Sequence, residues 1–165
     1  MADQTSWPDR DWARPGDPFG LQRFVEAQQG LYASVLADLK GGRKRTHWMW
    51  FIFPQLEGLG HSATSRHYAI KSLEEAQHYL RHPVLGTRLL ECTEAVLAVA
   101  NRSAAEILGY PDDLKLKSSM TLFATLKDAP AVFAQVLDRY YGGEGDERTL
   151  QLLVQCKEKA GHKDF

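Results

Sequence analysis

The sequence is poor in cysteine and in net charge, and each shortage argues against a class of protein. Only two of the 165 residues are cysteine, Cys92 and Cys156, and neither stands at a spacing that metal ligands use. Two isolated cysteines indicate small buried thiols in a reducing compartment rather than a disulfide framework. The formal net charge of -1 gives no overall field that would draw the chain onto nucleic acid or an anionic membrane. Any basic binding site must therefore be local.

Long apolar runs are also missing. No stretch approaches the ~18 consecutive apolar residues that mark a membrane-spanning helix. The first residues, MADQTSWPDRDWARPGD, lack the basic-then-apolar order of a signal peptide. We therefore expect a cytoplasmic protein with no membrane partner. Residues 1–16 show no helical period and contain Pro8 and Pro15, so we expect them to form a flexible N-terminal tail.

The common catalytic and cofactor motifs are absent as well. The histidines form no HxxxH or HExxH pair, which disfavours a metal site. There is no GxGxxG or Walker-type glycine loop for a nucleotide cofactor, and no GxSxG turn for a serine hydrolase. The sequence therefore predicts no metal and no cofactor, and it leaves open whether the chain is an enzyme.

What the sequence does contain is apolar residues at helical spacing. From Leu21 to Leu39 they recur with a period near 3.6, which predicts one helix that Asp17 caps and Gly41-Gly42 ends.

Two capping boxes mark further helix starts. Ser72 stands three residues before Glu75, and Ser103 stands three residues before Glu106, which is the spacing at which these residue types cap each other's backbone. No window alternates between apolar and polar residues as a half-buried strand does. We therefore predict an all-α fold: one compact, bundle-like domain of about seven to eight helices over residues 17–165.

Two segments concentrate polar and aromatic side chains. The first is HWMWFIFPQ, residues 47–55, directly behind the basic run GGRKR, residues 41–45. The second is PDDLKLKSSMT, residues 111–121. Each lies at a predicted helix N-terminus, where unpaired N–H groups and the helix dipole favour anions. If the fold brings the two segments together, they predict a binding site.

Each of these features also has a purely structural explanation. Aromatic residues such as Trp48 are more often part of a core than a platform for a ligand. A histidine on an apolar segment, such as His47, is more often a hydrogen-bonded structural residue than a catalyst. The basic run follows a helix C-terminus, where cations are favoured in any case. Asp113 and Lys117 stand four residues apart, the spacing of an ion pair on a helix surface.

Four stretches carry a resemblance to a known family: RFVEAQ (23–28), GGRKRTHWMWFIFPQLEGLGHS (41–62), HYAIKSLEEAQHYLRHPVLGTRL (67–89) and GYPDDLKLKSSMTLF (109–123). They are similar to the DUF1810 family, bacterial proteins of unknown function, over most of residues 17–155. The resemblance implies an all-helical fold and no established activity. The family's polar positions match here as His47, Gln55, Ser62, Tyr68, Asp113, Lys117 and Ser119.

The leading hypothesis is a pocket between the two polar segments that binds a small anionic or nucleotide-like molecule. Trp48 or Trp50 would supply a ring face, and Lys117 the positive charge. His47, Asp113 and Lys117 are the candidate catalytic groups. The expected ligand-binding residues are His47, Trp50, Gln55, Ser62, Tyr68, Lys117 and Ser119.

Two other functions stay open. The GGRKR run and its neighbouring aromatics would also serve as a surface patch for a protein partner, which the sequence does not identify. Basic residues interleaved with aromatics permit binding of single-stranded nucleic acid, but one short cluster in a nearly neutral chain makes this the weakest of the three hypotheses.

Overall fold

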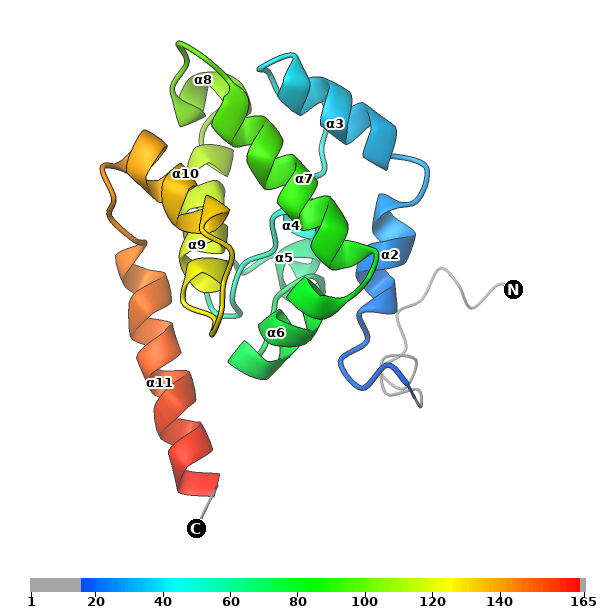
Figure 1. Cartoon of the computed structure of the whole chain (residues 1–165). Coiled ribbons are helices and arrows are strands. Elements are labelled where there is room, and N and C mark those ends of the chain that lie inside the picture. The colour runs from blue at the N-terminus through cyan, green and yellow to red at the C-terminus, as the bar shows by residue number, and fades with distance from the viewer. Residues whose placement is uncertain (1–15, 164–165) are drawn as a thin grey trace.

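The computed structural model describes residues 16–163, with side chains up to Lys157, and these residues form helices and no strand (Figure 1). The predicted all-α class is confirmed, with ten helices where about seven to eight were expected. The expected N-terminal tail covers residues 1–16, of which residues 1–15 lie outside the described part. None of the described helices is long and apolar enough to cross a membrane. The helices are α2 (Gln22–Gln28), α3 (Tyr32–Lys40), α4 (Met49–Ile52), α5 (Ala63–His67), α6 (Leu73–Arg81), α7 (Leu85–Ala98), α8 (Ala104–Leu108), α9 (Asp112–Ala124), α10 (Val132–Tyr141) and α11 (Glu147–Lys163).

The first expected helix is broken in two. α2 ends at Gln28 and α3 begins at Tyr32, and between them Gly30 takes a left-handed φ of +80°. Glycine adopts this conformation without strain, and it stops a right-handed helix. The prediction of one continuous helix was therefore wrong. The break lets the two helices pack against different partners, α2 against α4 and α3 against α7.

Helices α7 and α9 form the centre of the domain. In Figure 1, α7 crosses the face of the molecule between α3 and α10, with α9 behind α10. Every residue of α9 from Ser118 to Phe123 is buried, because α8, α10 and α11 cover different sides of this helix. The hydroxyls of Ser118 and Thr121 donate to the carbonyl oxygens of Leu114 and Lys117, 3.2 and 2.7 Å away. These bonds let polar residues lie inside a buried helix.

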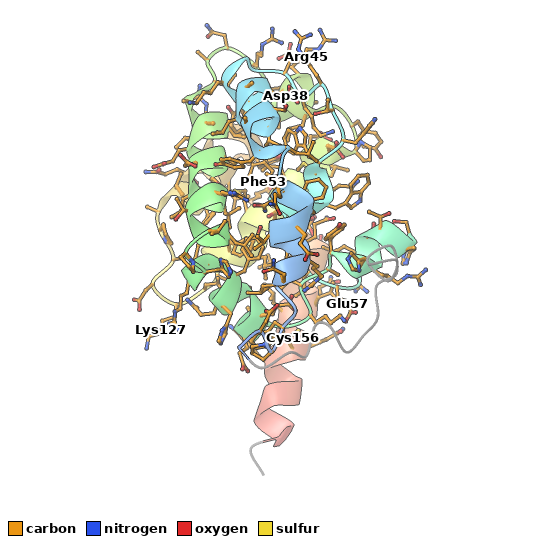
Figure 2. All side chains as sticks on the ribbon, turned by 90° about the vertical axis from the view of Figure 1, so that its right-hand side faces the viewer. Asp38, Arg45, Phe53, Glu57, Lys127 and Cys156 are labelled. Carbon is orange, nitrogen blue, oxygen red and sulfur yellow. The ribbon has the colours of Figure 1, made fainter. Side chains whose placement is uncertain are left out.

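Helix α11 begins against α9 and then extends beyond the rest of the molecule, as Figure 1 and Figure 2 show. Asp146 caps it, because its Oδ2 accepts a hydrogen bond from the N–H of Thr149 at 2.9 Å. Leu153 is buried, whereas Leu150 and Val154 are 43% and 56% exposed. Leu153 therefore belongs to the core, whereas Leu150 and Val154 lie on the outer side of the helix.

A buried ion pair ties α2 to α6. Arg23 is only 3% exposed, and its Nη2 lies 2.8 Å from Glu75 Oε2. The remaining guanidinium donors reach backbone carbonyl oxygens of Phe19, Gly20, His67 and Ala69. All five donors of the guanidinium thus have acceptors, which offsets the cost of burying its charge.

This ion pair also explains why one of the two expected capping boxes is incomplete. Ser103 and Glu106 form a complete box, as predicted. At Ser72 only half of the box forms: Ser72 Oγ accepts from the N–H of Glu75, but the Glu75 carboxylate is held by Arg23 and by the N–H of Lys71.

Candidate functional site

The two polar segments of the sequence lie against each other. Lys44 Nζ is 3.0 Å from Asp112 Oδ2, and the N–H of Lys44 donates to the carbonyl oxygen of Ile107 at 2.6 Å. Lys115 Nζ lies 4.8 Å from the centroid of the Trp50 ring. The basic loop before α4 therefore meets the N-terminal end of α9, the contact that the sequence left open.

Within the basic run, Lys44 differs from the two arginines. The Lys44 side chain is only 8% exposed, and its Nζ lies 5.2 Å from the centroid of the Trp48 ring. Arg43 and Arg45 are exposed. Arg43 and Arg45 are therefore surface cations that follow a helix C-terminus, whereas Lys44 is held inside the contact with α9.

Asp38, which no sequence pattern predicted, holds this loop in place near Arg45 (Figure 2). Its Oδ2 accepts hydrogen bonds from the N–H of Arg45, Oγ1 of Thr46 and Nε1 of Trp48, at 3.0, 3.2 and 3.0 Å. Burial alone would raise the pKa of Asp38, but these hydrogen bonds outweigh it and lower the pKa below its usual value. An acidic residue near the end of a helix has no distinctive pattern, so no signal in the sequence marked it.

Most of the aromatic segment belongs to the core. Trp48, Phe51 and Phe53 are 1%, 9% and 0% exposed, whereas Trp50 is partly exposed. Three of the four aromatic residues are therefore part of the core, as the structural explanation of this segment predicted. This burial also removes most of the aromatic surface from the interaction patch that the sequence allowed.

Trp50 lines a small pocket together with Gln55 and Tyr68. The volume of this pocket is about 20 Å³, and the loop over residues 57–69 supplies most of the remaining lining. The Gln55 carboxamide and the Tyr68 hydroxyl form no hydrogen bond within the described part of the chain. Burial, with a smaller effect of the Glu26 carboxylate, raises the pKa of Tyr68 even though Arg23 opposes the shift. Tyr68 is therefore a neutral hydrogen-bonding group at neutral pH.

Two further predicted residues, Ser62 and His47, lie outside the lining of the pocket. Ser62 is the N-cap of α5, and its Oγ accepts a hydrogen bond from the N–H of Ser65 at 3.0 Å. Ser65 itself lines the pocket. His47 is exposed and directly precedes Trp48.

The other predicted residues on α9 lie away from Trp50. Lys117 Nζ is 5.8 Å from the centroid of the Tyr141 ring, and the Tyr141 hydroxyl donates to the carbonyl oxygen of Asp113. Asp113 and Lys117 form no ion pair, and one carboxylate oxygen of Asp113 is buried without a hydrogen-bond partner in the described structure. Ser119 is fully buried. Residues two apart on an α-helix point about 200° apart, which explains why Lys115 rather than Lys117 reaches Trp50.

The described residues thus form a compact, all-helical domain in which a basic loop, an aromatic segment and a buried central helix meet beside a narrow pocket. The chain belongs to the DUF1810 family, whose members are described as proteins of unknown function. The family model matches residues 18–153. The chain is also similar to the crystal structure of the conserved hypothetical protein Rv1873 from Mycobacterium tuberculosis. The two share 59% sequence identity with a TM-score of 0.82, over 84% of this chain and 99% of that chain. No curated protein matches the chain.

Proposed function

We propose that the protein binds a small anionic, nucleotide-like molecule beside Trp50. The proposal rests on the surroundings of Trp50, the partly exposed aromatic ring of the segment. Lys115 lies over this ring. Gln55 and Tyr68 line the same pocket as Trp50, and their side-chain polar groups have no hydrogen-bond partner in the described chain. A planar ring would stack on Trp50, and the Gln55 carboxamide and the Tyr68 hydroxyl would bind its polar edge.

The local charge favours an anion. Asp112 lies 3.0 Å from Lys44 Nζ through one carboxylate oxygen and 3.3 Å from Lys115 Nζ through the other. The basic loop and the first turns of α9 together carry four cations, Arg43, Lys44, Arg45 and Lys115, against three carboxylates, Asp38, Asp112 and Asp113, which leaves one positive charge in excess. The helix dipole adds to the attraction for an anion at this end.

Catalysis stays a separate prediction. If the protein is an enzyme, the reaction would be group transfer or hydrolysis. His47 or Asp113 would act as the acid or base, and Lys117 would stabilise the negative charge that develops in the transition state. Because Asp113 and Lys117 face Tyr141 rather than Trp50, the geometry supports binding more directly than it supports a reaction.

Thermal unfolding against nucleotides, phosphosugars, NAD-related compounds and dicarboxylates tests the binding proposal. A compound at one hundred times its dissociation constant adds about 2.7 kcal/mol to the free energy of unfolding, which shifts the melting temperature by several degrees. Lys115→Gln should abolish the shift, and Lys117→Gln, two residues along the same helix, is the matched control. A compound that shifts both variants as it shifts the unchanged protein would contradict the role of Lys115. A panel without any active compound would contradict the proposal itself.

A further inference from the structure

The pocket beside Trp50 is too small for the ligand proposed for it. Its volume is about 20 Å³. One water molecule needs roughly 10–15 Å³ of such volume, whereas pockets for small molecules usually measure roughly 300–1,000 Å³. Part of the structure around Trp50 must therefore move before a nucleotide-sized molecule can bind.

The part that covers the pocket is the loop over residues 57–69, which includes α5. No residue of α5 is buried, and in Figure 2 this helix stands out at the side of the molecule. The opposite wall comes from Trp50, Gln55 and Leu56, and Leu56 is only 2% exposed. The pocket thus has a core-side wall and a cover in which residues 57–66 are exposed or partly buried, with Leu59 as the apolar side chain that packs against the core.

The base of the loop is firmly held. Leu56 and Ile70 form a parallel backbone bridge, in which the N–H of Glu57 donates to Ile70 and the N–H of Ile70 donates to Gln55, both at 2.8 Å. Arg23 also donates to the carbonyl oxygens of His67 and Ala69 just before the bridge. Any movement is therefore confined to the residues between these anchors.

The tip of the loop is held mainly by contacts between its own residues. Ser62 and Ser65 bond to each other, which ties the tip to itself rather than to the core. Gly60 packs so closely on Ser65 that a β-carbon at Gly60 would lie 2.6 Å from Cβ and Oγ of Ser65. Gly58 has φ of +106°, and a β-carbon there would lie 3.3 Å from Leu152 Cδ1 on α11. Segments with so few buried contacts open at low free-energy cost.

We propose that residues 61–66 form a lid over Trp50, which swings about Gly58 and Gly60 while the Leu56–Ile70 bridge stays closed. This inference rests on the proposed function, because the lid explains how a larger molecule reaches the pocket. The lid controls the access of any small molecule to this side of the Trp50 ring, so its action can be measured without knowing the ligand.

Acrylamide quenching of Trp50 fluorescence tests the lid. Replacing Trp7 and Trp12 with phenylalanine leaves Trp50 as the accessible tryptophan, because Trp48 is 1% exposed. In this background Gly60→Ala should raise the quenching constant, since the new methyl group cannot fit against Ser65 while the lid is closed. Adding Ser65→Gly removes the opposing side chain and should return the constant to its starting value.

An unchanged quenching constant in Gly60→Ala, with native circular dichroism, would overturn the lid. Failure of the thermal-shift panel would instead remove the proposed ligand, so the two failures are distinguishable.

Discussion

Ser119 and Thr121 stand two residues apart in the buried helix α9, and their hydroxyls have different surroundings. Thr121 Oγ1 donates to the carbonyl oxygen of Lys117 and accepts from the N–H of Asp146, at 2.7 and 2.8 Å. Ser119 Oγ is buried without a hydrogen-bond partner in the described structure. A buried polar group without a partner costs stability, so these two side chains should respond oppositely to the loss of their hydroxyls.

We expect Ser119→Ala to leave the free energy of unfolding unchanged or to raise it by up to about 1 kcal/mol, because it removes an unsatisfied group. Thr121→Val should lower it by about 1–3 kcal/mol, because the N–H of Asp146 loses its acceptor. Urea denaturation measures both. A loss in Ser119→Ala as large as that in Thr121→Val would show that the Ser119 hydroxyl has a partner in solution.

His67 makes stability depend on pH. Burial, and then the positive charges of Arg23 and Lys71, lower the pKa of His67 from 6.5 to about 4. Because the folded protein binds this proton less readily than the unfolded chain, the stabilising contribution is complete above pH 6.5 and is lost as the pH falls from 6.5 to about 4. His67→Gln should therefore flatten the fall of the unfolding free energy across this range. The exposed residue His47, changed to Gln, is the control, and an equal effect of both changes would contradict the assignment.

At the scale of single elements, Gly30 separates α2 from α3. Nothing lies within 4 Å of the position that a β-carbon at Gly30 would occupy, so the cost of adding one is the left-handed backbone alone. Gly30→Ala should lower the free energy of unfolding by about 1–2 kcal/mol. Gly30→Asn should lower it less, because asparagine tolerates this conformation. Thermal denaturation of the two variants checks the order, and equal losses would contradict it.

Local patterns predicted the start of α8, but they predicted neither the break at Gly30 nor the contacts around Trp50. The capping box of Ser103 and Glu106 depends on residues close in sequence, so the sequence predicted it correctly. The roles of Asp38 and Lys115 depend on how distant elements pack. The spacing of residues along α9 does not reveal which side of the helix faces Trp50, and so the sequence favoured Lys117 as the cation.

At the scale of the whole molecule, one hydrophobic core joins nearly all of the described helices. Its buried residues run from Leu21 before α2 to Leu153 on α11, and they include Trp48 near the start of the aromatic segment. A domain with one contiguous core usually unfolds in a single cooperative step.

We therefore expect tryptophan fluorescence and far-ultraviolet circular dichroism to report the same urea midpoint. The circular dichroism follows all helices, whereas buried Trp48 makes the fluorescence sensitive to the core around α4. Two separated midpoints would show instead that α4 and its surroundings unfold independently of the remaining helices.

The backbone bridge between Leu56 and Ile70 has one more consequence, for protein engineering. Because the chain leaves and re-enters the core at this bridge, the two ends of the loop lie side by side. The exposed residues Ser62, Ala63 and Thr64 form its tip. Exposed tips of this kind tolerate inserted peptides, since the insertion adds length without separating the anchored ends. A fluorescent tag or an affinity peptide placed at this tip would leave the core intact and would report directly on events at Trp50.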